Sequence, residues 1–405
     1  MALIAPPLAL YLHFPWCVSK CPYCDFNSHS LHGELPQQAY LEALLGDIDA
    51  QLPGLEGRSI VSVFLGGGTP SLFEPAAFAR LFEALRGRLP LAADAEITLE
   101  ANPGTIERGR FADYRGAGIN RVSLGAQSFA APMLERLGRI HGVEDTRVAA
   151  EELHAAGLAN FNLDLMYALP GQDLAGALAD VQAALELSPA HISHYQLTLE
   201  PGTVFGGRPP PGLPDDELGF SMQQHCQATL AAAGFLQYEV SAYARAGAQC
   251  AHNLNYWNFG DYLGAGAGAH GKLTHGARGI ITRSVREREP RRYLARGWCG
   301  EPATSTVASA DLPFEFMMNA LRLNEGFEAA QFEARTGLAW TEIAPRVQRL
   351  AARGLLTGEA GRWRPTELGR RFLNDLIADF LIASRPSLAP GFGPLLRKKP
   401  EGSVV

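Results

Sequence analysis

Short apolar runs alternate with longer amphipathic stretches through the first 240 residues. The runs are rich in β-branched and aromatic residues, which is typical of buried strands, and the stretches between them have helical apolar spacing. Repeated strand–helix units predict an α/β fold with a parallel sheet, here a partial (β/α)6-type TIM-like barrel. The apolar runs lie in LALYLHF, SIVSVFLGGGTP, EITLEANPGT, NRVSLGAQSF, NFNLDLMYALPG and HISHYQLTLEPGT, and the helical stretches are 36–50, 75–88, 143–157 and 173–187.

The pattern changes after residue 300. The segments LPFEFMMNALRLNEGF, WTEIAPRVQRLAARGLL and PTELGRRFLNDLIADFL have helical spacing, and GLLTGEAGRWRPT between the last two indicates a hairpin. Helices followed by a small hairpin predict a mainly α, winged-helix-like C-terminal domain. We expect a barrel domain over 1–300, this second domain over 301–383, and a flexible tail rich in Pro and Gly over 384–405.

Composition narrows the function. The chain has 35 Lys and Arg against 42 Asp and Glu, a formal net charge of −7, and the C-terminal domain is mixed in charge. Such a balance argues against a nucleic-acid partner, because that affinity rests on cations that neutralise phosphates. No apolar run approaches the roughly 20 residues that span a bilayer. Half of the six cysteines lie in one cluster, which favours a metal site in a reducing compartment, and so a cytoplasmic protein.

The N-terminal stretch MALIAPPLALYLHFPW is apolar but lacks a basic leading region. Cleavage of a signal peptide here would remove or border Cys17, so we expect no signal peptide.

Polar residues follow the predicted strands at their C-terminal ends. They are the cysteines of CVSKCPYC, residues 66–69, Glu100 with Asn102, Gln127 and Asp164. In a parallel βα sheet or barrel, ligands bind at this edge. The distribution therefore predicts an active or binding site there rather than core packing.

Cys17, Cys21 and Cys24 have the spacing C-x3-C-x2-C. Three thiolates can hold a zinc ion if His13 or His29 supplies a fourth ligand. They can also hold a 4Fe–4S cluster, in which case one iron stays open to an outside ligand. The residues alone leave both alternatives open.

The motifs YLHFPWC, CPYCDFNSH, GGGTPS, LEANPGT, SLGAQSF and DLMYALPGQ resemble those of the radical S-adenosylmethionine (SAM) superfamily, in its coproporphyrinogen dehydrogenase-like branch. In that superfamily the open iron of the cluster binds SAM, and electron transfer generates a 5′-deoxyadenosyl radical. The resemblance implies that the three cysteines hold the cluster. It further implies that the SAM contacts are Tyr11, Tyr23, Gly67, Gly68, Thr69, Glu100, Gln127, Arg139 and Asp164. Salt bridges or turn caps are the alternative for the two acidic residues, and a solvated helix face is the alternative for Arg139.

Two departures distinguish this chain from the dehydrogenases. Phe26 stands where they have a fourth cysteine, and only ten residues precede Tyr11. Both features resemble the HemW-type haem chaperones instead, as does HNLNYW at 252–257. The resemblance implies that His252 binds haem, with Cys250 and His270 as rival ligands. The alternative is an ordered segment whose histidine is only hydrogen-bonded.

The resemblance therefore predicts a haem chaperone that binds a 4Fe–4S cluster, SAM and haem and passes haem to an acceptor haemoprotein. The alternative is a radical SAM oxidoreductase such as a coproporphyrinogen dehydrogenase, so whether the chain is an enzyme stays open. The same resemblance suggests respiratory haemoproteins as acceptors, a peripheral contact with membrane proteins, and a homodimer.

Overall fold

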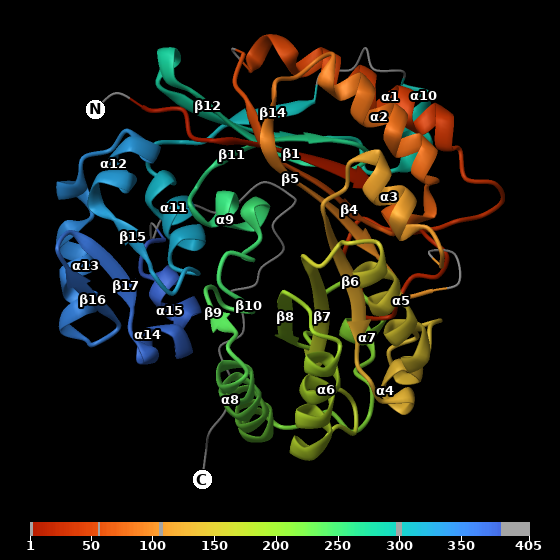
Figure 1. Cartoon of the computed structure of the whole chain (residues 1–405). Helices are drawn as coiled ribbons and strands as arrows, with labels where there is room; N and C mark the ends of the chain where they lie inside the picture. Colours follow the sequence, from red (N-terminus) through yellow and green to blue (C-terminus); the bar gives the residue numbers. More distant parts are fainter. Residues whose placement is uncertain (1–2, 56, 105–107, 297–301, 382–405) are drawn as a thin grey trace. The chain divides into compact units, whose positions relative to one another are not determined.

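The computed structural model describes residues 3–55, 57–104, 108–296 and 302–381 of the 405-residue chain (Figure 1). Two compact units divide between residues 307 and 308. The expected tail over 384–405 lies outside the described residues. None of the helices in the described ranges has both the length and the apolar character needed to cross a membrane.

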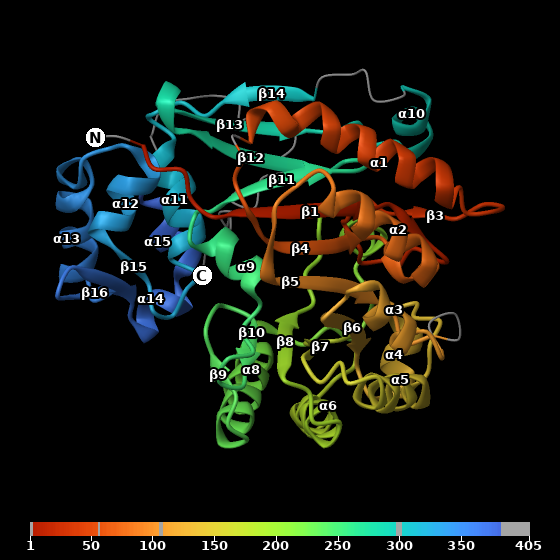
Figure 2. The same ribbon diagram turned by 45° about the horizontal axis from the view of Figure 1, so that its top comes forward.

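The larger unit is built on a sheet of twelve strands with the order β14-β13-β12-β11-β1-β4-β5-β6-β7-β8-β10-β9. Figure 2 shows these strands in succession, with β14 at the top. All neighbours from β11 to β8 pair in parallel, and the strands at both ends are antiparallel. The parallel part consists of β1 (Leu8–Phe14), β4 (Ile60–Gly67), β5 (Leu91–Ala101), β6 (Arg121–Gln127), β7 (Phe161–Tyr167), β8 (His191–Gln196) and β11 (Asp261–Ala265).

The predicted fold class is confirmed, because the six predicted strands form one continuous parallel series. The sequence pattern did not indicate the antiparallel extensions. They are β9 (Leu236–Gln237), β10 (Ala242–Ala244), β12 (His270–His275), β13 (Ile280–Val285) and β14 (Ala303–Thr306). Since β14 pairs with β13, residues 303–306 belong to the larger unit.

Helices cover the outer face of this sheet (Figures 1 and 2). Their apolar sides bury the core, for example Phe78 and Phe82 of α2 and Ala177 and Val181 of α6, all less than 2% exposed. The covering helices are α1 (Gln37–Gln51), α2 (Pro75–Arg86), α3 (Phe111–Ala117), α5 (Val143–Ala155), α6 (Leu174–Glu186) and α8 (Asp216–Ala232). Side chains alternate between the two faces of each strand, so every second residue points into the barrel.

The smaller unit has its own aromatic core. Phe316 packs edge-on against Phe327 and Phe332, with ring centroids 5.4 and 5.3 Å apart. The predicted hairpin is present as β16 (Leu356–Glu359) and β17 (Arg362–Pro365), which pair in antiparallel fashion. The remaining elements are α11 (Leu312–Ala320), β15 (Phe327–Glu328), α12 (Ala329–Thr336), α13 (Ala344–Ala352), α14 (Glu367–Arg371) and α15 (Leu373–Ala378).

Candidate functional site

The predicted site residues lie on neighbouring parallel strands. Gly67 and Gln127 end β4 and β6, and Glu100 is next to the last residue of β5. Tyr11 and Asp164 lie in the middle of β1 and β7. The backbone N–H of Gly67 on β4 donates to Glu100 Oε2 on β5 at 3.0 Å. Asp164 on β7 lies close enough to Glu100 for the two carboxylates to repel each other, and Tyr11 on β1 also lies within the field of Glu100. Neighbouring parallel strands therefore deliver these four residues to one place.

The three clustered cysteines lie on a loop that is closed at its base. Cys17 ends β2 (Trp16–Cys17), which pairs with β3 (His29–Ser30), and Cys17 O accepts from the backbone N–H of Leu31 at 2.8 Å. Within the loop, Cys24 N–H donates to Cys21 O at 3.1 Å. All three thiols are free and partly exposed. Burial raises the pKa of the Cys17 thiol, and a hydrogen bond with Thr69 opposes that rise.

This donor set fits an iron–sulfur cluster. Among the described residues, no three His, Cys, Asp or Glu side chains converge in a way that could hold one metal ion. A cluster does not require such convergence, because each thiolate binds a different iron. His13, one candidate for a fourth zinc ligand, has both ring nitrogens engaged, by Tyr11 Oη at 3.0 Å and Asn27 O at 2.9 Å.

The glycine motif fastens the end of β4 to the strand that leads into the cysteine loop. Gly68 N–H donates to Phe14 O and Thr69 N–H donates to Trp16 O, both at 2.7 Å. Gly67 has a φ of +113°, and a Cβ there would lie 2.4 Å from His13 Cε1. The sequence alone suggested glycines for close approach to a ligand; the structure shows that the protein's own packing already excludes a side chain.

The carboxyl groups of Glu100 and Asp164 are both buried but have different hydrogen-bond partners. Burial raises the pKa of Glu100 to about 7, and Asp164 adds to that rise while the Gly67 N–H opposes it. Burial also raises the pKa of Asp164, against hydrogen bonds from Asn162 Nδ2 at 2.8 Å and Ser123 Oγ at 3.2 Å. Two poorly solvated carboxyl groups side by side favour a cationic ligand, which would restore both to the charged form.

Gln127 ends β6 with a φ of +65°, which is uncommon for a residue with a side chain. Its Oε1 accepts a hydrogen bond from Tyr195 at 3.0 Å. Strained backbone of this kind persists where the surroundings fix it and is often found at functional sites. The Gln127 amide thereby links the end of β6 to Tyr195 of β8.

Arg139 does not lie on a solvated face. Its guanidinium donates to Gly125 O at 2.9 Å, to Asn102 Oδ1, and to Cys21 Sγ at 3.6 Å. Arg139 therefore ties the cysteine loop to β5 and β6. Tyr23, inside the loop, packs on an apolar group that includes Phe205, with ring centroids 6.4 Å apart. Burial raises the pKa of the Tyr23 hydroxyl, while nearby Arg139 lowers it.

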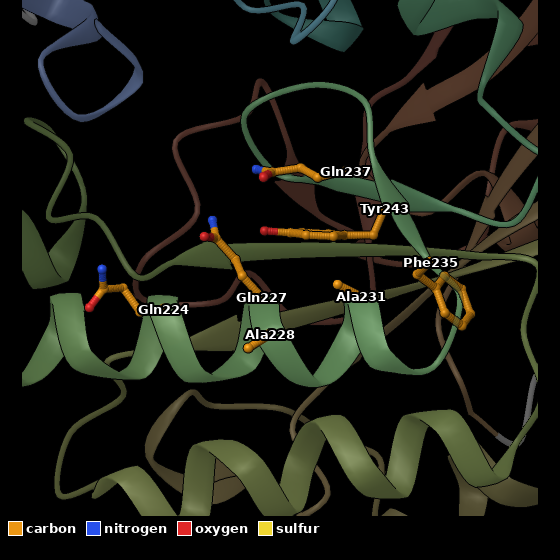
Figure 3. Close-up of a pocket in the computed structure, with 7 residues that line it drawn as sticks. All are labelled: Gln224, Gln227, Ala228, Ala231, Phe235, Gln237 and Tyr243. Atoms are coloured by element: carbon orange, nitrogen blue, oxygen red, sulfur yellow. The ribbon is translucent and has the colours of Figure 1, made fainter. Parts of the chain in front are cut away.

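A separate hollow of about 340 Å³ lies along α8 (Figure 3). Its walls are Gln224, Gln227, Ala228, Ala231, Phe235, Gln237 and Tyr243. The figure shows amide groups along one side of the helix and the Tyr243 ring above it. None of the predicted site residues lines this hollow, so it is distinct from the strand-end site.

Comparison with known proteins assigns the family. The model of the Radical SAM superfamily matches residues 11–182, and that of the HemN C-terminal domain matches residues 307–372. The protein named "Heme chaperone HemW" from Escherichia coli is 51% identical over 93% of this chain and 98% of its own length. Its namesake from Haemophilus influenzae is 47% identical, with the same coverage. The chain belongs to the HemW family.

A solved structure agrees at the level of the fold. The structure titled "Coproporphyrinogen III oxidase (HemN) from Escherichia coli is a Radical SAM enzyme" superposes with a TM-score of 0.77 and 23% identity. It covers 93% of this chain and 90% of its own. The HemW family thus shares the fold of that enzyme, and the HemN-type C-terminal domain accounts for the smaller unit.

In this HemW-family chain His252 lies on α9 (Ala251–Trp257), inside the barrel. The imidazole is 1% exposed, and burial lowers its pKa to about 3. Each ring nitrogen has a partner at 3.0 Å, Ser62 Oγ for Nδ1 and Tyr256 Oη for Nε2. Phe64 stacks on the ring at 5.0 Å. To ligate iron, His252 would have to give up one of these bonds, so a ligand role stays a prediction.

The other two candidate haem ligands, Cys250 and His270, differ in their exposure to solvent. Cys250 is 1% exposed and donates to Glu96 Oε1 at 3.5 Å, whereas His270 on β12 is exposed.

Sequence reasoning also missed Asn27. Its Nδ2 donates to Ala267 O and Arg288 O, both at 2.9 Å, so it joins the cysteine loop to residues far along the chain. No local pattern signals such a contact.

Proposed function

We propose that this chain is a haem chaperone, which binds haem and transfers it to an acceptor haemoprotein. The observation that carries the proposal is its similarity, over nearly the full length of both chains, to proteins named as haem chaperones. The barrel supports it, because Gly67, Glu100 and Gln127 lie at or next to the carboxyl ends of β4, β5 and β6. We propose that these residues form part of the cofactor site.

Cys17, Cys21 and Cys24 would hold a 4Fe–4S cluster with one open iron. When bound, such a cluster supplies an electron to SAM. Glu100 and Asp164 lie where charged carboxylates would accept the ammonium and ribose hydroxyl groups of SAM. Further contacts are proposed for Tyr11, Tyr23, Gly67, Gly68, Thr69, Gln127 and Arg139. Arg139 also keeps the cysteine loop in place through its bond to Cys21.

The proposal is tested by anaerobic titration of haem into protein whose cluster has been reconstituted, followed by the Soret band. We expect saturation near one haem per chain. His252→Ala is titrated in parallel, and weaker binding would place the ligand on α9. Absence of haem binding by protein with full iron content would refute the chaperone function. Release of carbon dioxide from coproporphyrinogen during anaerobic turnover would contradict chaperoning as the sole role.

The acceptor is proposed to be a haemoprotein of the respiratory apparatus, reached through a peripheral contact with membrane proteins. A homodimer and a cytoplasmic location complete the proposal. The cysteine cluster supports the location, since partly exposed thiols persist in the reduced form in a reducing compartment. Size-exclusion chromatography with light scattering, at several protein concentrations, tests the dimer.

A further inference from the structure

A hollow of about 440 Å³ opens beside the cysteine loop, a size within the range of small-molecule sites. Three segments far apart in the sequence line it: residues 20 and 24–29 of the loop, residues 201–203 after β8, and residues 288–289 after β13. Cys24 belongs to the lining, so the hollow adjoins the proposed cluster. His252, Cys250 and His270 do not line it.

Phe26 gives this hollow an aromatic wall. Its side chain is 59% exposed, although the backbone around it is firmly held. Lys20 Nζ donates to Phe26 O at 3.1 Å and to Ser28 O at 3.0 Å. The next residue, Asn27, is fixed by its two bonds to backbone carbonyls of residues 267 and 288. An apolar ring held in water on a fixed backbone beside a hollow favours a flat apolar ligand.

The lining carries two cations and two carboxylates, so its formal charges balance. Lys20 in the cysteine loop and Arg288 after β13 are the two cations of the lining, and both are exposed. Of the two acidic residues, Glu289 is engaged, because its carboxylate accepts from the backbone N–H groups of Arg291 at 3.1 Å and Arg292 at 2.7 Å. Asp25 is the remaining acidic side chain in the lining.

His29 adds an imidazole to the same lining. It is half-buried, its Nε2 lies 3.3 Å from Asn27 Oδ1, and the ring also hydrogen-bonds the backbone of Arg288, so binding iron would cost it one of these bonds. One hollow therefore presents an aromatic face, two cations and an imidazole. A haem matches this combination, since it has an apolar macrocycle, two carboxylate arms and an iron that accepts a nitrogen ligand.

We propose that this hollow binds the transported haem, with the macrocycle against Phe26, the propionates toward Lys20 and Arg288, and the iron toward His29. The inference rests on the proposed chaperone function and gives it a site. Because Cys24 and Asn27 line the same hollow, the cargo would lie against the loop that holds the cluster. Any change at the cluster that moves this loop would then alter how haem is held.

The test uses the full-length, cluster-reconstituted protein and haem titration followed by the Soret band. Phe26→Ala should weaken haem binding roughly tenfold. Phe26→Trp, which keeps an aromatic face, should retain it. The matched control is Phe372→Ala, because Phe372 is 48% exposed in the other unit and should not affect binding. Iron content, measured for each variant, verifies that the loop still holds the cluster.

The cation and the imidazole are tested with altered porphyrins. Arg288→Gln should weaken haem binding about threefold but leave the binding of haem dimethyl ester unchanged, since the ester lacks the charged arms. Arg291→Gln is its control. His29→Ala should shift the Soret band and weaken the binding of haem. It should still bind metal-free protoporphyrin IX as tightly as the wild type does. His32→Ala, at an exposed position, is the control and should change neither the Soret band nor the affinity for haem.

The outcomes separate the two proposals. If wild type binds haem and all pocket variants with full iron bind it equally well, the haem lies elsewhere and the inference is overturned while the function stands. If wild type with an intact cluster binds no haem, the chaperone function itself fails. Selective loss in Phe26→Ala, Arg288→Gln and His29→Ala, with their controls unaffected, supports the site.

Discussion

Glu100→Gln should make the protein more stable at alkaline pH while weakening its cofactor site. Burial raises the pKa of this carboxyl from about 4.5 to about 7. That difference corresponds to about 3 kcal/mol. The native state holds the Glu100 proton more tightly than the unfolded state does. The contribution of this carboxyl to the free energy of unfolding is therefore complete below pH 4.5 and is lost as the pH rises through 7. A neutral glutamine avoids the charged form altogether.

The assay is thermal unfolding of cluster-free protein at pH 5 and pH 8. Glu100→Gln should unfold at nearly the wild-type temperature at pH 5 and several degrees higher at pH 8. An amide oxygen can still accept the Gly67 N–H, so the backbone contact at 3.0 Å survives. Glu83→Gln, at an exposed position on α2, is the matched control and should show no such pH dependence.

SAM binding by reconstituted protein supplies the second measurement. If Glu100 takes the ammonium group as a carboxylate, the variant should bind SAM at least about tenfold more weakly, as expected for a lost charge-assisted bond. An equal gain in stability at both pH values would refute the assignment of a costly buried charge. Unchanged SAM affinity would refute its role as a ligand.

Three further predictions follow from the same geometry. Gly67→Ala should lower the free energy of unfolding by about 2 kcal/mol or more, and the melting temperature with it, because the added Cβ would lie 2.4 Å from His13. A wild-type melting temperature would contradict this packing argument. Cys21→Ser should lose most of the iron and the brown colour after reconstitution, whereas Cys226→Ala, outside the loop, should keep both; equal iron in the two would exclude the loop as the cluster site. Asn27→Ala should cost about 1–3 kcal/mol by losing two bonds to backbone carbonyls, and should speed the loss of iron on dilution; an unaltered rate would show that this link does not hold the loop.

Sequence pattern was sufficient for six of the seven parallel strands, all except β11. Periodicity marks a buried strand, and the end of that strand must lie at the sheet edge, so Glu100 could be assigned to this edge without coordinates. Asp164 lies instead in the middle of β7. The antiparallel additions could not be predicted in this way. Strands such as β9 have two residues and are defined only by the partner strand they pair with.

Contacts between residues far apart in the sequence explain why the surroundings of Asn27, Arg139 and His252 could not be predicted. Asn27 acts through carbonyls 240 and 261 residues away, and no local pattern encodes that partner. Arg139 follows α4 (Ala131–Arg136), where helical spacing cannot tell a solvated arginine from one turned inward. For His252 the sequence offered ligation or simple hydrogen bonding. Only the packing of α9 against β4 shows that both nitrogens have partners.

The polar residues inside the predicted strands have a similar explanation. In NFNLDL, Asn162 and Asp164 alternate with apolar residues and share one face of β7. On β8, His191 and Ser193 pair with them and share that face, which is the barrel interior. His194 lies on the opposite face, where it stacks on Tyr167 at 4.7 Å. Tyr238 donates to His191 Nε2 at 2.9 Å, His191 Nδ1 donates to Asn162 Oδ1 at 2.6 Å, and Asn162 Nδ2 donates to Asp164 at 2.8 Å. Asn162 Oδ1 can only accept, which fixes the tautomer of His191 and the direction of the whole chain. Bonds aligned in one direction in a low-dielectric interior strengthen one another and fix the last acceptor. These buried hydrogen bonds hold the Asp164 carboxylate in one orientation, and an apolar barrel interior could not do so.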